Sequence, residues 1–150
     1  MKNRSKLLGK ILFLFYIVFL FYFLIFSDWY GRTGVREEYH YNFILFQEIG
    51  RYWRHREQLG MISFFNLGGN VAIFVPFGFF MSMASYRRRF LNVTCHGFLT
   101  SLVVEVFQLI SRVGSFDVDD ILLNTVGAVI GYITFVICDM IRRKYGKRKR

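Results

Sequence analysis

Four long apolar blocks, separated by polar stretches, set the pattern of this chain. The blocks are Leu7–Phe26, Met61–Tyr86, Phe90–Ile110 and Ile121–Ile141. A helix that crosses a bilayer needs about 20 consecutive, mostly apolar residues, and each block is long enough. Hydrophobic residues make up 54% of the 150 residues, which leaves little chain for a soluble domain. The pattern therefore predicts an all-α fold, a single membrane domain over residues 1–150 built as a bundle of four transmembrane helices.

One connection between the blocks is long, and it carries a second hydrophobic pattern. Ser27–Gly60 is aromatic and charged, and glycines interrupt it. Within it, apolar residues recur at helical spacing, at Phe43, Phe46, Ile49 and Trp53. An amphipathic helix that lies in the membrane interface has this pattern. A loop packed over the end of the bundle fits it equally well, so both interpretations stay open.

Basic residues gather beside the apolar blocks. Lys and Arg cluster before the first block, at Arg87–Arg89, and in the tail 142–150. Because basic loops tend to stay on the cytoplasmic side, both termini are predicted to lie inside, with fourteen of the 20 Lys and Arg residues there. This N-in, C-in arrangement is typical of a multi-pass protein of the cell membrane. The net charge of +10 thus follows from membrane orientation, and no nucleic-acid partner is expected.

Polar side chains inside the third block need an explanation. Glu105 and Gln108 interrupt the apolar run GFLTSLVVEVFQLI. Placing a charged side chain at the centre of a bilayer costs about 2.5–3.5 kcal/mol. Spacings of three and four residues put Glu105, Gln108 and Arg112 along one side of one helix. That side is therefore expected to face other polar groups or water rather than lipid.

The other blocks supply matching polar groups at the same end. Asn66 and Asn70 lie four residues apart near the start of the second block, and a short loop with three aspartates leads into the fourth. In the predicted topology all these groups approach the outer leaflet. We expect an outward-facing polar pocket, because it avoids exposing charge to lipid. Its candidate residues are Asn66, Asn70, Glu105, Gln108, Arg112, Asp117, Asp119, Asp120 and Asn124.

Two other roles for these residues remain open. In a structural role, Arg112 neutralises Glu105 and the asparagines bridge helices. Asp117 and Asp119 cap the fourth helix, and the Gly127-x-x-x-Gly131 pattern packs helices together. In an enzyme, Glu105 and an aspartate act as acid and base on a lipid-linked substrate. No G-x-S-x-G, H-E-x-x-H or phosphate-binding loop supports catalysis, so binding is favoured while enzyme activity stays undecided.

Composition does not indicate metal or cofactor chemistry. Cys95 and Cys138 are the only cysteines, and both fall near the predicted inner ends of helices. Such residues are expected to be small buried apolar groups rather than a disulfide or a metal site. His40, His55 and His96 are scattered without ligand spacing. Neither a metal nor another cofactor is expected.

Three stretches of the sequence resemble a known family. NLGGNVAIFVPFGFF, SLVVEVFQ and DVDDILLNTVGAVIGY are similar, in order and spacing, to the motifs of the VanZ-like family across Asn66–Tyr132. YNFILFQEIGRYW is similar to the aromatic segment that precedes these motifs in the family. The resemblance implies a small multi-helix membrane protein. The polar positions of the family motifs fall on Asn66, Asn70, Glu105, Gln108, Asp119, Asp120 and Asn124.

The resemblance also carries an expectation about function. The founding member of the family is associated with resistance to teicoplanin, a glycopeptide antibiotic, which implies a role in antibiotic resistance or in the cell envelope. It carries over no catalytic role. Together with the expected pocket in the lipid bilayer, it favours binding of an amphiphilic antibiotic or a lipid-linked cell-wall molecule. An intramembrane enzyme and a structural or partner-assembly protein are the alternatives, and the sequence identifies no partner protein.

The predicted orientation is testable by thiol labelling in intact cells. Ser115→Cys and Tyr86→Cys would each be made in a Cys95→Ala/Cys138→Ala background and treated with a membrane-impermeant reagent. We expect labelling at position 115 and protection at position 86, because the N-in, C-in arrangement puts them on opposite sides of the membrane. The reverse labelling pattern would contradict the orientation.

Overall fold

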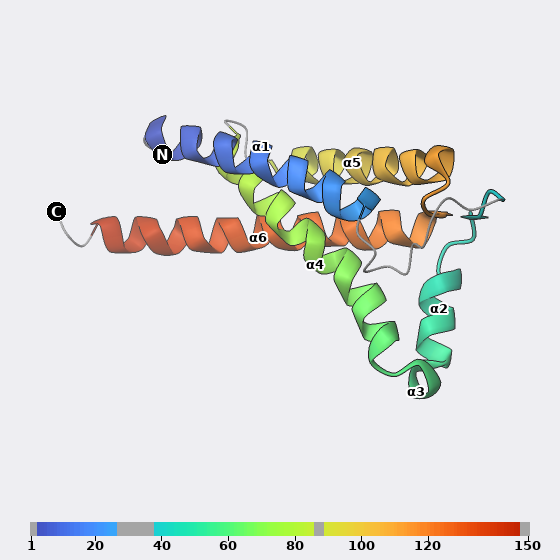
Figure 1. The fold of residues 1–150 in the computed structure, drawn as a ribbon. Helices are drawn as coiled ribbons and strands as arrows, with labels where there is room; N and C mark the ends of the chain where they lie inside the picture. The colour runs from blue at the N-terminus through green and yellow to red at the C-terminus, as the bar shows by residue number, and fades with distance from the viewer. Residues whose placement is uncertain (1–2, 27–37, 86–88, 148–150) are drawn as a thin grey trace.

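The structure is a computed structural model that describes residues 3–26, 38–85 and 89–147. In chain order its elements are α1 (Asn3–Phe26), β1 (Tyr41–Asn42), α2 (Gln47–Arg54), α3 (Arg56–Leu59), α4 (Met61–Ala84), α5 (Phe90–Ser111), β2 (Phe116–Asp117) and α6 (Val118–Lys147). Figure 1 shows α1, α5 and α6 running alongside one another, whereas α4 crosses them obliquely. The short helix α2 lies crosswise near one end of the bundle (Figure 1).

Four of these helices, α1, α4, α5 and α6, are long and apolar enough to cross a membrane. This confirms the predicted all-α fold with four spanning helices. Helix α6 is longer than its predicted block, since it begins at Val118 and continues to Lys147 in the basic tail. Asp117 accounts for the early start, because its carboxylate accepts a hydrogen bond from Asp119 N at 2.8 Å, as the side chain of an N-cap residue does.

The core lies where the four long helices meet. Leu20 of α1, Phe74 and Phe77 of α4, Val104 of α5 and Ala128 of α6 are each at most 1% exposed. Helix α4 is central to this arrangement, because it packs most extensively against α6 and also contacts α1 and α5. The oblique path of α4 therefore decides where the ends of the other helices lie relative to it.

Glycine allows α4 and α6 to cross in near backbone contact. Gly127 and Gly131 of α6 lie against the carbonyl oxygens of Val71 and Val75, which are four residues apart on α4. Gly78 of α4 meets the α6 backbone in the same way. A Cβ added at any of these glycines would overlap a backbone oxygen. The G-x-x-x-G pattern therefore packs two helices together, as small residues do in membrane bundles.

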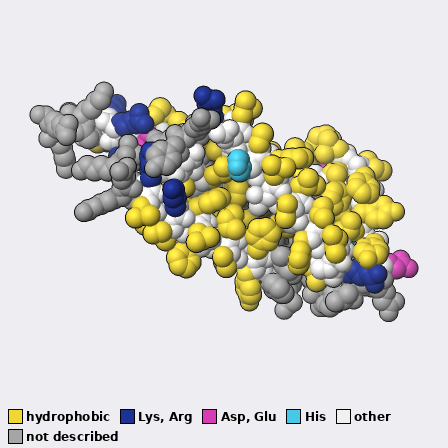
Figure 2. Space-filling view, turned by 90° about the horizontal axis from the view of Figure 1, so that it is seen from above, with side chains coloured by type: hydrophobic (Ala, Val, Ile, Leu, Met, Phe, Trp, Pro, Cys, Tyr) yellow, Lys and Arg dark blue, Asp and Glu magenta, His cyan; other side chains and the backbone are white. Residues whose placement is uncertain are grey.

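Apolar side chains cover the outside of the helices as well as their core. Phe15 of α1 and Ile110 of α5 are 71% and 70% exposed. In Figure 2, hydrophobic side chains cover most of the visible face, and most of its Lys and Arg side chains lie toward one end. Cys95 and Cys138 are free thiols and are exposed, so the expectation that they are buried was wrong. Their helix faces turn outward, where a lipid-facing thiol needs no partner.

The segment that begins at residue 38 folds back over one end of the bundle. Its strand β1 pairs in parallel with β2, which lies directly before α6. In this register Asn42 is opposite Asp117, and Phe116 N donates a hydrogen bond to His40 O at 3.0 Å. The strand pair thus attaches the long connection to the turn between α5 and α6.

The predicted amphipathic stripe in this segment is only partly helical. Helix α2 begins at Gln47, so Phe43 and Phe46 precede it. Phe46 adopts a left-handed backbone conformation with φ 64°, which does not occur inside a right-handed helix. No residue of α2 is buried. Apolar packing therefore contributes little to holding α2, which is attached mainly by polar contacts.

The close crossing of α4 and α6 predicts a steep cost for one added methyl group. Gly131→Ala is expected to destabilise the protein by about 1–3 kcal/mol, because two backbones must separate to admit the Cβ. The matched control is Gly50→Ala in α2, where the new Cβ would meet only the Arg54 guanidinium at 3.8 Å. Thermal unfolding in detergent, followed by circular dichroism, compares the two. Equal stability of both variants would contradict the crossing.

Candidate functional site

A cavity of about 450 Å³ opens at the end of the bundle where α5 turns into α6. Its wall comes from four parts of the chain: the segment with β1 and α2, the N-terminal half of α4, the turn before β2, and the start of α6. Five of the nine predicted residues line it, namely Asn66, Asn70, Asp117, Asp119 and Asp120. The other lining residues are His40, Tyr41, Asn42, Glu48, Arg51, Tyr52, Leu67, Gly114, Ser115 and Leu123.

Asp119 connects the start of α6 to the start of α2. Its Oδ1 accepts a hydrogen bond from Phe46 N at 2.5 Å, and its Oδ2 accepts from Glu48 N and Ile49 N at 2.9 and 3.1 Å. Such N–H groups at a helix start have no intrahelical partner, and a negative charge there is favourable. The residue is 0% exposed. Asp119 therefore caps α2, rather than its own helix as the structural interpretation held.

Asp117 joins β1, α5 and α6. Its Oδ1 accepts hydrogen bonds from Asn42 Nδ2 at 3.1 Å and from Asp119 N at 2.8 Å, so it caps α6 as predicted. Its own N–H donates to Oε2 of Glu105 at 2.9 Å. Burial raises the pKa of the Asp117 carboxyl above its ordinary value, although the hydrogen bonds from Asp119 and Asn42 act in the opposite direction.

Helix α4 contributes two side-chain amides to the wall. Asn70 Nδ2 donates a hydrogen bond to Oδ1 of Asp120 and so joins α4 to α6. Asn66 Nδ2 donates to the Tyr52 hydroxyl at 2.9 Å and so joins α4 to α2. Because the two asparagines are four residues apart, both amides lie on the same face of α4 and reach the cavity.

Helix α2 adds an ion pair to the wall. Arg51 and Glu48 are paired across one helical turn. Burial raises the pKa of the Glu48 carboxyl, and the Arg51 guanidinium beside it partly offsets the rise. Four carboxyl groups, those of Glu48, Asp117, Asp119 and Asp120, share the wall with the single guanidinium of Arg51. The wall of the cavity therefore holds more acidic than basic groups.

Three further predicted residues lie behind the wall in the contact between α5 and α6. Glu105 and Gln108 are each 2% exposed, and the Gln108 side chain packs against Gly114. Asn124 lies deeper and donates a hydrogen bond to Ser101 Oγ at 2.9 Å. These residues support the cavity from the inside of the bundle and do not line it.

Arg112 lies away from the cavity and from Glu105. It directly follows α5 in a left-handed conformation, with φ 56°. Its guanidinium carbon lies 4.4 Å from the centroid of the Tyr39 ring. The ion pairs in the described part of the chain include those of Arg51, Arg142 and Arg143, and none between described residues includes Arg112. The neutralisation of Glu105 by Arg112, which the structural alternative required, is therefore not found.

The sequence interpretation missed the wall supplied by β1 and α2. Glu48, Arg51 and Tyr52 lie at helical spacing, opposite the apolar stripe on which the prediction rested. That polar face was the available signal. The sequence pattern does not show which residues this polar face contacts, because β1 and α2 reach the cavity through contacts with residues about 70 positions later in the chain.

The comparison with known families agrees with these motifs. The model of the VanZ/LLP1 family matches residues 13–139. The chain belongs to the VanZ/LLP1 family. The matched region includes every residue that lines the cavity, so the VanZ/LLP1 family resemblance covers the whole candidate site.

One curated relative in this family comparison is Protein VanZ of Enterococcus faecium. It is 28% identical over 133 residues, which is 85% of this chain and 73% of that protein. No solved structure matches the chain significantly.

Because Asp119 accepts hydrogen bonds from three backbone N–H groups, removal of its side chain is expected to loosen the start of α2 selectively. Asp119→Ala should weaken the N-terminal cap by about 1–2 kcal/mol, so the amides of Phe46, Glu48 and Ile49 should exchange hydrogen about 5–30-fold faster. Hydrogen exchange read by mass spectrometry measures this. The matched control is Asp139→Ala, which removes a carboxylate at the far end of α6. Unchanged exchange in residues 46–49 would rule out the cap.

Proposed function

We propose that this VanZ/LLP1 protein binds the polar head of an amphiphilic envelope molecule in the acidic cavity. The molecule would be a lipid-linked cell-wall component or an amphiphilic antibiotic of the teicoplanin type, and the cavity would face the outside of the cell. The observation that carries the proposal is the cavity itself. It is a polar space of about 450 Å³ at one end of a bundle whose outer surface is apolar.

The size and position of the cavity support a ligand rather than simple helix packing. Ligand sites commonly occupy about 300–1,000 Å³ and occur between the helices of bundles. Four parts of the chain contribute to this one wall. Helices can pack through small residues alone, as α4 and α6 do at their crossing, so packing does not require an open polar space.

The charge of the wall indicates the chemistry of the head group. Of the four carboxyl groups in the wall, Asp119 is fully buried and bound to α2. Those of Glu48, Asp117 and Asp120 remain to face a ligand, beside one guanidinium that is already paired with Glu48. A phosphate group would meet like charge there, whereas ammonium, amide and hydroxyl groups would find acceptors. We therefore infer a head that presents N–H or O–H donors, such as a sugar, a peptide or an amine.

Binding is favoured over catalysis by the environment of Glu105. The enzyme alternative needs this carboxylate to reach a substrate. Its side chain is 2% exposed, and its Oε2 accepts a hydrogen bond from the Asp117 backbone. Glu105 is better suited to positioning Asp117 than to transferring a proton.

The proposal predicts that one carboxylate can be neutralised without loss of the fold. Asp120→Asn keeps the volume of the side chain, and its amide oxygen can still accept the hydrogen bond from Asn70. We expect about tenfold weaker binding of teicoplanin by protein in nanodiscs, because a charge-assisted contact of about 1.5 kcal/mol is lost. Thermal stability should change little.

The control for this experiment is Asp139→Asn on the same helix. Asp139 is paired with Arg142 and Arg143 at the other end of α6, so its neutralisation removes the same charge far from the cavity. Native mass spectrometry of the purified variants adds a test for a retained lipid-linked molecule. If neither teicoplanin nor a co-purified amphiphile distinguishes Asp120→Asn from Asp139→Asn, the cavity is not the binding site.

A further inference from the structure

Four consecutive apolar side chains are exposed beside the cavity. Phe43, Ile44, Leu45 and Phe46 are 64%, 65%, 50% and 57% exposed. Together they form the docking loop (Phe43–Phe46), which connects β1 to α2. Single apolar residues are common on protein surfaces. A contiguous group of exposed apolar side chains, such as these four, marks an interaction surface.

The length of α5 gives the depth at which the chain leaves the membrane. Its 22 residues from Phe90 to Ser111 extend about 33 Å at 1.5 Å per residue, close to the roughly 30 Å hydrocarbon thickness of a bilayer. Charged residues flank both ends, Arg89 before the helix and Arg112 after it. Arg112 therefore lies at the membrane–water interface, where long basic side chains place their charge.

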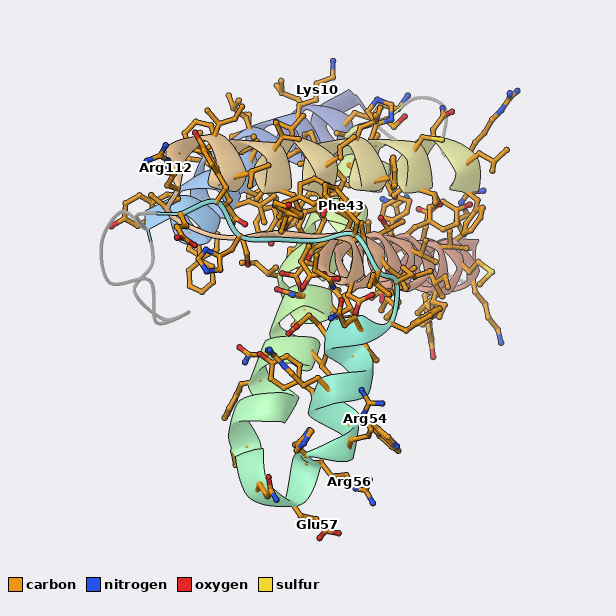
Figure 3. All side chains as sticks on the ribbon, turned by 90° about the vertical axis from the view of Figure 1, so that its right-hand side faces the viewer. Lys10, Phe43, Arg54, Arg56, Glu57 and Arg112 are labelled. Atoms are coloured by element: carbon orange, nitrogen blue, oxygen red, sulfur yellow. The ribbon has the colours of Figure 1, made fainter. Side chains whose placement is uncertain are left out.

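Direct contacts place the docking loop at that same depth. The Arg112 guanidinium lies over the Tyr39 ring at 4.4 Å, two residues before β1. β1 is paired with β2, and the Phe43 ring lies 5.1 Å from that of Phe116, centroid to centroid. At the other end of the loop, Phe46 N is held by Asp119 in the first turn of α6. Figure 3, which faces this end of the bundle, shows Phe43 on the segment that crosses it and Arg112 at its edge.

We propose that the docking loop inserts into the leaflet nearest the cavity, with its apolar side chains among the lipids. Its neighbours have the composition of an interfacial belt, with Tyr39 and Tyr41 before the loop and Trp53 after it, each more than half exposed. Tyr and Trp are enriched at this depth because their rings are apolar and their polar atoms reach water. The lipid partner is thus indicated by depth and composition together.

Two hydrogen bonds anchor the docking loop at its two ends. Asn42 at its start is held by Asp117, and Phe46 at its end is held by Asp119. Burial of the four side chains in lipid would therefore cost little ordering of the backbone. Because Asn42 and Glu48 line the cavity on either side of the loop, insertion sets the cavity at the level of the lipid head groups. An amphiphile held in the bilayer could then present its head directly to the wall.

The test uses fluorescence of a single tryptophan in the whole protein. Ile44→Trp is made in a Trp29→Phe/Trp53→Phe background and reconstituted in nanodiscs, with and without lipids brominated on their acyl chains. Val103→Trp, at an exposed position within α5, is the lipid control, and Lys144→Trp, at an exposed position near the end of α6, is the water control. Leu45→Trp repeats the measurement if Ile44→Trp does not fold.

Insertion predicts that the loop tryptophan behaves like the lipid control. Its emission should be blue-shifted, lose intensity with brominated lipid to an extent comparable with Val103→Trp, and be little quenched by aqueous iodide. Quenching by iodide as in Lys144→Trp would overturn the proposal, since the loop would then lie in water. Protection from both quenchers would also overturn it, because a second protein surface, such as another copy of the chain, would cover the loop. None of these readouts depends on ligand binding in the cavity.

Discussion

The carboxylate of Asp119 connects the helix bundle, at the start of α6, to the short helix α2. Backbone N–H groups at the start of α2 have no partner within the helix, and this one side chain accepts hydrogen bonds from Phe46, Glu48 and Ile49 N–H. Helix α2 has no buried residue, so apolar packing adds little to this cap. Asp119 holds the start of α2, while the pairing of β1 with β2 and the hydrogen bond from Asn66 to Tyr52 hold the rest of this part of the wall.

A second constraint is the close crossing of α4 and α6. The glycines of α6 allow the backbone of α4 to cross it closely, and the crossing carries Asn66 and Asn70 to the same end as the aspartates. Buried polar groups behind the wall complete the arrangement, since Glu105 holds the backbone of Asp117 from inside the bundle. Apolar packing thus builds the bundle, and hydrogen bonds to carboxylates build the cavity at its end.

The sequence pattern was sufficient for the spans and for much of the polar set. Membrane helices satisfy their own backbone hydrogen bonds, so length and hydropathy alone determine that α1, α4, α5 and α6 form. The cost of charge in lipid likewise indicated that Glu105 must face inward, and it is 2% exposed. In the structural alternative its partner was Arg112, whose guanidinium instead lies over the Tyr39 ring, because a spacing on one helix does not show which neighbour lies closer.

What the sequence by itself determined is therefore the class of the protein: four apolar helices, polar groups gathered toward one end, and glycines where two helices meet. Only the tertiary structure decided what each polar group does. Asp119 reaches α2 across about 70 residues of chain, and Glu48 and Arg51 join the wall through the same contact. The physical reason is that helix formation is local, whereas a hydrogen bond between distant segments depends on how the helices cross and where the connecting chain returns.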